Sequence, residues 1–250
     1  MGKNKLQKFA EMATFDHVFQ ADFEQLKDGG FDKKGHWSEY FGNNNPIVLE
    51  LGCGKGEYTV GLAKLYPEKN FIGVDIKGAR MHTGAKQAKE EQLTNVAFIR
   101  TRIEFIEYFF ATDEVSEIWV TFPDPQMRKE NKRLVGTMML DRYRKFLVAD
   151  GFVHLKTDSN FLYLYTKAMM EENNITPLVM LDDLYSGNYN DKILSIQTYY
   201  ETKWINYGLT IKYIKFAIPR GVGLSEPDLE IEHDTYHSAG RGAKEKTHNN

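Results

Sequence analysis

Four acidic residues stand at the ends of short apolar runs, where strands would end. They are Glu50, Asp75, Asp124 and Asp158, and Arg102 occupies a fifth such position. The carboxyl ends of parallel strands meet at one edge of a sheet, so these side chains are expected to face a common crevice. Solvated acids in unrelated loops are the alternative, which is easier to accept for one acid than for four.

A glycine loop follows the first acid and indicates its ligand. The apolar run from Ile47 opens into a loop with Gly52, Gly54 and Gly56, and a helical pattern follows. A strand, a glycine turn and a helix together bring backbone close to a nucleoside. At the mouth of such a loop Glu50 would repel a pyrophosphate, but it would attract the ammonium and sulfonium of S-adenosylmethionine.

Asp75 ends the next apolar run, about 20 residues past the loop, where a carboxylate can accept hydrogen bonds from both ribose hydroxyls. Together with Glu50 it favours a site for this methyl donor. A tight turn with two solvated acids remains the simpler alternative.

The segment Phe122–Arg133 combines a rigid acid with a basic run. Pro123 and Pro125 flank Asp124 and restrict the backbone on both sides. Residues 124–145 hold seven basic and three acidic side chains, a local charge of +4 in a chain of net charge −3. This predicts a phosphate-binding surface beside the crevice, with Lys129, Lys132 and Arg133 as candidate RNA contacts, although a solvated basic face has the same pattern.

A nucleobase acceptor fits these residues. Guanine N7 carries a lone pair and no proton, so its methylation needs alignment and charge stabilisation but no general base. Carboxylates suit the donors at N1 and N2 of guanine.

The composition limits the class of protein. With 250 residues and 42% hydrophobic content the chain can build one α/β domain with a full core. The single cysteine, Cys53, allows no internal disulfide and suits a reducing cytosol. Apolar runs are far too short for a membrane helix and the N-terminus lacks an apolar signal core, so a soluble, cytoplasmic protein is expected.

The periodicity predicts a doubly wound, mainly parallel sheet with helices on both faces and an antiparallel strand near the C-terminus. Strands are expected at 47–51, 70–75, 96–100, 117–122, 152–156 and 210–218, and helices at about 56–66, 79–92, 134–148 and 160–172. Residues 1–46 form a lead-in whose phenylalanines either pack on the domain or, with its lysines, touch a phosphate backbone. The domain then spans 47–218, and the polar residues 219–250 are expected to be a mobile extension.

Over residues 36–218 the sequence resembles the bacterial tRNA (guanine-N7-)-methyltransferases. The matching segments are WSEYFG from Trp37, ELGCGKG from Glu50, FIGVD ending at Asp75, FPDP with the basic run, HLKTD ending at Asp158, and TYYE from Thr198 to Glu201. The resemblance implies a Rossmann-like class I methyltransferase that transfers methyl from S-adenosylmethionine to N7 of a guanine in the tRNA variable loop. It implies a monomer or homodimer that requires no metal.

Matched position by position, the resemblance also assigns roles. It implies donor binding by Glu50, Gly52, Gly54, Asp75 and Asp124, catalysis by Asp124, and substrate binding by Arg128, Asp158, Thr198 and Glu201.

Three features depart from the family pattern. Gln126 stands where the family has tryptophan, and the basic run is shorter and lacks a histidine. Arg102 replaces an acid or amide near the adenine, so Glu104 or backbone groups would take over that edge. Residues 219–250 have no counterpart, and their His233 and His237 have the spacing of metal ligands but no third ligand near in sequence.

Three other functions remain open. The Pro-Asp-Pro segment is similar to the motif of exocyclic-amine methyltransferases, although no aromatic residue follows it. A non-catalytic RNA-binding protein on the same scaffold is a second alternative, but the intact acids argue against it. An NAD(P)-dependent oxidoreductase fits less well because Glu57 occupies the position of the third glycine in its motif.

Overall fold

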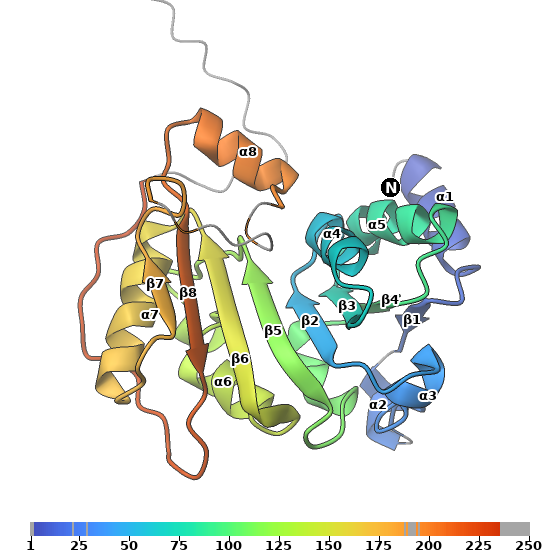
Figure 1. The fold of residues 1–250 in the computed structure, drawn as a ribbon, viewed down its shortest axis with the longest axis horizontal. Coiled ribbons are helices and arrows are strands. Elements are labelled where there is room, and N and C mark those ends of the chain that lie inside the picture. The colour runs from blue at the N-terminus through green and yellow to red at the C-terminus, as the bar shows by residue number, and fades with distance from the viewer. Residues whose placement is uncertain are drawn as a thin grey trace, which may run out of the picture.

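The computed structural model describes residues 3–21, 23–28, 30–187, 189, 194 and 196–235. One mixed sheet organises these described residues (Figure 1). The elements are α1 (Lys3–Met12), β1 (Val18–Gln20), α2 (Phe23–Asp28), α3 (Trp37–Phe41), β2 (Ile47–Leu51), α4 (Glu57–Leu65), β3 (Asn70–Asp75), α5 (Gly78–Glu90), β4 (Val96–Arg100), η1 (Ile103–Tyr108), β5 (Val115–Thr121), η2 (Glu130–Lys132), α6 (Thr137–Tyr143), β6 (Leu147–Thr157), α7 (Asn160–Glu172), β7 (Val179–Leu181), α8 (Tyr199–Asn206) and β8 (Lys212–Ala217).

The sheet has eight strands in the order β1-β4-β3-β2-β5-β6-β8-β7. Pairings from β1 through β6 are parallel, and β8 runs antiparallel to both β6 and β7. The doubly wound, mainly parallel sheet with a late antiparallel strand is therefore confirmed. The strand order reverses between β2 and β5, where such sheets bind their ligands.

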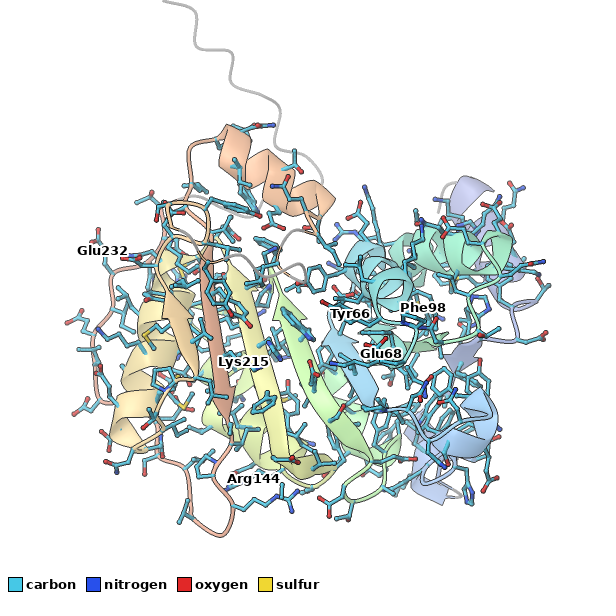
Figure 2. The ribbon with its side chains drawn as sticks, in the orientation of Figure 1. Tyr66, Glu68, Phe98, Arg144, Lys215 and Glu232 are labelled. Atoms are coloured by element: carbon cyan, nitrogen blue, oxygen red, sulfur yellow. The ribbon has the colours of Figure 1, made fainter. Side chains whose placement is uncertain are left out.

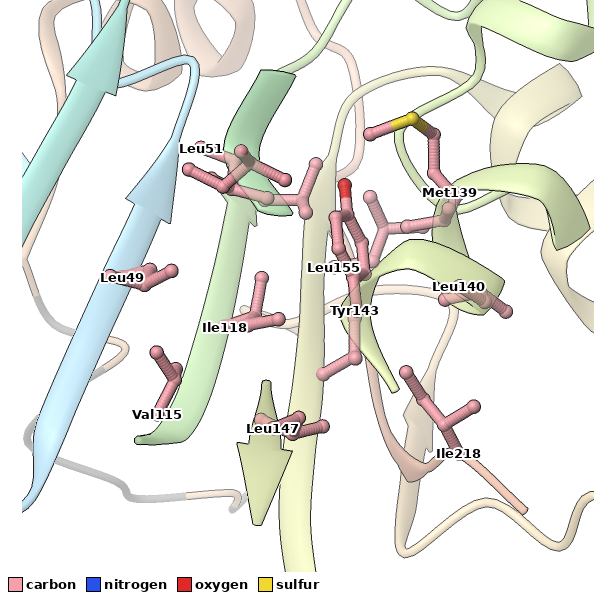
Figure 3. Close-up of a cluster of buried hydrophobic side chains, with 14 of the residues drawn as sticks. Leu49, Leu51, Val115, Ile118, Met139, Leu140, Tyr143, Leu147, Leu155 and Ile218 are labelled. Atoms are coloured by element: carbon pink, nitrogen blue, oxygen red, sulfur yellow. The ribbon is translucent and has the colours of Figure 1, made fainter. Parts of the chain in front are cut away.

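Alternating side chains of the central strands feed two hydrophobic cores. Leu49 and Leu51 point to the face that α3, η1, α6 and α7 cover, whereas Val48 points to the face covered by α1, α4 and α5. Figure 3 shows Leu49, Ile118 and Leu155 from three neighbouring strands on the side where Tyr143 and Met139 of α6 lie. Each fully buried side chain of this kind contributes about 1.5–3 kcal/mol.

The predicted limits of β2, β3, β4 and α7 agree with the structure, but the helix expected at 134–148 is wrong in length. The observed α6 ends at Tyr143, and β6 already begins at Leu147. Leu147 pairs with Val115 at the start of β5 and is buried, so sheet pairing overrides the apolar helical pattern there. The strand β1 and the helix α8 were not predicted.

The N-terminal lead-in packs on the domain. Met12 is fully buried, Phe15 stacks on His82 of α5, and Phe19 meets Trp37 edge-on. The packing interpretation of these aromatic residues is confirmed. A contact between the lysines and phosphate stays a prediction.

Residues 219–235, here called the strap, lie against the domain. After β8 the chain turns and runs back along α7 toward the edge of the sheet where α8 lies (Figure 1). In Figure 2 Arg144 marks the turn, where its guanidinium donates to the carbonyls of Pro219 and Val222, and Glu232 lies near the other end of the strap. Leu224 and Ile231 pack on the core. These contacts attach residues 219–235 to the domain, which the composition did not predict. Residues 236–250, with His237, lie outside the described part, and the domain limits and the mobility of the extension stay predictions.

Candidate active site

A cavity of about 460 Å³ opens at the carboxyl ends of β2, β3, β5 and β6. It brings together most of the predicted site residues, as the parallel topology requires. Its lining includes Glu50, Gly52, Gly54, Asp75, Asp124, Asp158 and Thr198. Of the other predicted residues, Arg128, Lys129, Lys132, Arg133 and Glu201 are not part of this lining.

Asp75 holds the glycine loop in place. Its Oδ2 accepts from the amide of Gly54 at 2.9 Å, and its Oδ1 accepts from the amide of Lys77 at 2.6 Å. Gly52 and Gly54 have φ of 81° and 57°, in the left-handed region that suits glycine. Each Asp75 oxygen keeps a lone pair for a further donor, so the ribose contact predicted for Asp75 is compatible with these bonds.

Glu50 is a buried acid that faces the cavity. Its Oε2 accepts from the amide and hydroxyl of Thr59 at 2.8 and 2.5 Å, and its Oε1 accepts from Thr121 Oγ1 at 2.7 Å. Burial raises the pKa of Glu50 to about 7 despite these hydrogen bonds. The Glu50 carboxyl therefore changes charge near neutral pH. Its Oε1 accepts one hydrogen bond, from Thr121, and keeps a lone pair for one more.

Asp124 sits on a constrained loop at the end of β5. Phe122 and Gln126, on either side of the Pro-Asp-Pro segment, have φ of 47° and 49°, which non-glycine residues rarely adopt. The loop is closed by a hydrogen bond from the Gln126 amide to Asp124 Oδ1 at 3.0 Å and by one from the Phe122 amide to the Lys156 carbonyl. Asp124 itself is exposed to the cavity and solvent.

Arg133 does not lie on the RNA-binding surface that the sequence predicted. It is buried, and its guanidinium lies 4.2 Å from the ring centroid of Tyr165. From there it donates to the carbonyls of Gln126 at 3.3 Å and Met127 at 3.1 Å. The prediction of an RNA contact is thus wrong for Arg133, because its planar guanidinium packs against aromatic rings in the core and is not exposed to solvent.

Glu201 was expected to bind the substrate, but its carboxylate is fully buried. It pairs with Lys156 Nζ at 2.7 Å and accepts from Tyr185 OH at 2.6 Å. Thr198 and Glu201 also form a capping box that begins α8. Glu201 therefore fixes α8 above the cavity, and its predicted contact with guanosine would require this pairing to open.

The remaining basic residues of the run are exposed. Arg128 and Lys129 face solvent, and Lys132 lies 3.8 Å from Glu104. Lys132, Glu104 and Arg102 line a second pocket of about 260 Å³ that shares Gly52 and Asp75 with the main cavity. Arg102 and Glu104, the two side chains that the resemblance placed near an adenine, thus lie together beside the glycine loop.

Three cations on the wall of the main cavity were not predicted from the sequence. Lys55 of the glycine loop, and Lys77 and Arg80 at the beginning of α5, line it together with the acids. A signal was present, because the first turn of a helix that follows a strand in this fold borders the crevice. On that ground the positions after Asp75 could have been predicted to line the cavity.

Two further side chains of reactive types, His154 and Cys53, are buried. His154 is buried and stacks on Trp119 at 3.9 Å, away from the cavity lining. Burial raises the pKa of the Cys53 thiol well above its usual range, which disfavours a nucleophilic thiolate.

Within the described ranges no three His, Cys, Asp or Glu side chains form a group that could hold a metal ion. In the same part of the chain no helix is long and apolar enough to span a membrane.

The topology of the sheet is that of a class I, Rossmann-like methyltransferase fold. A 30S ribosomal A1408 methyltransferase from an uncultured bacterium superposes with a TM-score of 0.55 at 16% identity, over 76% of this chain and 95% of that structure. The 16S rRNA methyltransferase KamB gives a TM-score of 0.56 at 12% identity, over 77% and 96%. At such identities the likeness concerns the fold alone.

Sequence relatives define the family. A family model described as a putative methyltransferase matches residues 44–214. The tRNA (guanine-N(7)-)-methyltransferase of Bacteroides fragilis is 57% identical over 98% of this chain and 97% of its own length. The enzyme of the same name from Porphyromonas gingivalis is 55% identical over 93% and 98%. The chain belongs to the tRNA (guanine-N(7)-)-methyltransferase family.

Proposed function

We propose that this protein transfers the methyl group of S-adenosylmethionine to N7 of a guanine in the variable loop of tRNA, giving 7-methylguanosine. The observation that carries the proposal is the convergence of Asp124 and Asp158 on the cavity that the glycine loop borders. It is supported by the family to which the chain belongs. A tRNA substrate would place the reaction in the cytoplasm.

The donor would lie against the glycine loop. The free acceptor site of Glu50 suits its ammonium, and the remaining lone pairs of Asp75 suit ribose hydroxyls. Gly52 and Gly54 leave room for the close approach of the ligand to the backbone. The adenine would enter the second pocket, where Arg102 and Glu104 replace the usual polar contact. When bound, the donor supplies an electrophilic methyl group to the cavity.

The acceptor guanine would lie between Asp124 and the end of β6. Asp124, Asp158 and Thr198 line that part of the cavity and would accept from the N1 and N2 donors or orient the ring. N7 has no proton to lose, so Asp124 would act by positioning the base and stabilising the positive charge that develops on the purine. The exposed Arg128, Lys129 and Lys132 would bind phosphates that flank the guanine.

Incubating the protein with labelled S-adenosylmethionine and unmodified tRNA, followed by nucleoside analysis, tests the proposal. We expect label in 7-methylguanosine, and none with Asp124→Asn. The matched control is Asp150→Asn, an exposed acid within β6 that does not line the cavity. A labelled exocyclic amine would favour the exocyclic-amine alternative, and the absence of any labelled nucleoside would contradict methyl transfer to tRNA.

A further inference from the structure

The strap uses its acids to hold the beginnings of the two helices it crosses. Glu226 Oε1 accepts from Thr137 Oγ1 at 2.5 Å and from the Thr137 amide at 3.3 Å, at the first residue of α6. Asp234 accepts from Ser159 Oγ at 2.5 Å and from the Phe161 amide at 3.0 Å, at the beginning of α7. Acids stabilise helix N-termini, where free amides carry positive partial charge. Both contacts tie the strap to the end of the fold that holds the cavity, and Asp234 lines the cavity itself.

Glu226 also binds a residue in the core. Tyr165 of α7 is buried, and its hydroxyl donates to Glu226 Oε2 at 2.7 Å. Burial and the Glu226 carboxylate raise the pKa of Tyr165, so the phenol remains a proton donor throughout the neutral range. The hydrogen bond fixes the ring of Tyr165 from the strap side.

Arg133 packs over the face of the same ring. The guanidinium of Arg133 lies between Tyr165, at 4.2 Å from the ring centroid, and Phe161, at 5.0 Å. Stacking on two aromatic rings sets the orientation of the planar group. Its hydrogen bonds to the Gln126 and Met127 carbonyls then end on the loop that carries Asp124.

That loop needs external support. Phe122 and Gln126 both adopt left-handed backbone conformations, which persist only where the surrounding structure enforces them. Arg133 supplies such enforcement at Gln126 through the hydrogen bond to its carbonyl. A continuous series of contacts therefore joins Glu226 through Tyr165 and Arg133 to the backbone of the Asp124 loop.

We infer that the strap is part of the catalytic apparatus, and that Glu226 is a positioning residue which, through Tyr165 and Arg133, holds Asp124 in its reactive place. This inference rests on the proposed function of Asp124. Composition predicted a mobile extension here, whereas these contacts hold the strap against α6 and α7. Loss of the Glu226 carboxylate should let Tyr165 and Arg133 shift, which loosens the loop without touching the donor loop at Gly52 and Gly54.

The test compares Glu226→Ala with Glu230→Ala in the full-length chain. Glu230 is an exposed acid on the same strap and makes no hydrogen bond or ion pair with the residues that the structure describes. With saturating tRNA and donor, below the unfolding temperature of every variant, we expect Glu226→Ala to lower kcat about tenfold, since a displaced catalytic group costs up to about a hundredfold. The donor Kd, measured by calorimetry, should stay within about twofold, and Glu230→Ala should match the wild type.

Further variants separate positioning from folding. Tyr165→Phe keeps the ring against Arg133 but removes the hydroxyl, so it tests the pathway even if Glu226→Ala fails to fold; we expect a kcat loss of about three- to tenfold. Combined with Glu226→Ala it should add little, because both remove the same hydrogen bond. Glu226→Gln, which keeps an acceptor oxygen, should recover part of kcat.

Two outcomes would overturn the inference. One is an unchanged kcat in folded Glu226→Ala and Tyr165→Phe, even with a lower melting temperature, which would make the strap purely structural. The other is a loss confined to donor affinity. Failure of the proposed function is recognised separately, because the wild type itself would then form no 7-methylguanosine.

Discussion

The buried carboxyl of Glu50 gives the sharpest prediction. Burial raises its pKa to about 7, from 4.5 for a glutamate in the unfolded chain. Between these two values the folded chain holds a proton that the unfolded chain has lost, so the free energy of unfolding falls as pH rises through this window. The destabilisation is small below pH 4.5 and fully developed above pH 7.

The substitution Glu50→Gln removes this destabilisation. The amide is nearly isosteric: its oxygen can accept from both groups of Thr59, and its NH2 can donate to the hydroxyl of Thr121, which can reverse its role. Each pH unit between the two pKa values is worth about 1.4 kcal/mol. The variant should therefore exceed the wild type by less than about 1 kcal/mol at pH 5 and by about 3 kcal/mol at pH 8.

Urea unfolding of the donor-free protein at pH 5, 7 and 8 measures the difference. The matched control is Glu68→Gln, the same substitution at an exposed acid beyond α4. A Glu50→Gln variant that differs from the wild type by the same amount at every pH would refute the reasoning. Although it is more stable, the Glu50→Gln variant should bind S-adenosylmethionine at least about tenfold more weakly, because a neutral amide does not attract the ammonium group.

Three further predictions concern the acceptor side of the site. Asp124→Ala should lower kcat by at least about a hundredfold while calorimetry shows retained donor binding; lost donor affinity with normal turnover of the bound fraction would contradict it. Reversing the charges of Arg128 and Lys132 should weaken tRNA binding and lower the slope of log affinity against log salt by about 2, and an unaltered slope would place the RNA surface elsewhere. Lys156→Met should lower the free energy of unfolding, measured by chemical denaturation, by about 3–5 kcal/mol, because it leaves the buried Glu201 carboxylate without its ion-pair partner. Adding Glu201→Leu should restore most of this free energy. A double variant that is no more stable than Lys156→Met would show that packing, and not the unpaired charge, causes the loss.

The sequence predicted the central part of the site because its signals are local. The limits of β2, β3 and β4 follow from apolar runs bounded by turn residues, and Glu50 and Asp75 follow from their places at or near strand ends. Parallel topology then brings the acids to one cavity without further information. Where long-range pairing competes with a local pattern, as at Leu147, the prediction failed.

The charge run after Asp124 shows the limit of such reasoning. Arg128, Lys132 and Arg133 look alike in sequence, but the first two are exposed and Arg133 is buried between aromatic rings. Only the position of α7 decides this, because α7 supplies Phe161 and Tyr165 from about 30 residues away. Burial of a charged group depends on partners, and partners are a property of the fold.

By itself the sequence determined a doubly wound sheet, a glycine loop suited to a nucleoside, and the acids that line the cavity, because spacing and strand ends specify each of these. The tertiary structure alone decided that Glu201 pairs with Lys156 under α8. It alone placed the strap along α7, with Glu226 on Tyr165. Residues 219–235 are mostly polar, and they contain few apolar side chains from which packing against the domain could be predicted. They are held by hydrogen bonds to helix starts and to a buried phenol, whose positions exist only once the domain has folded.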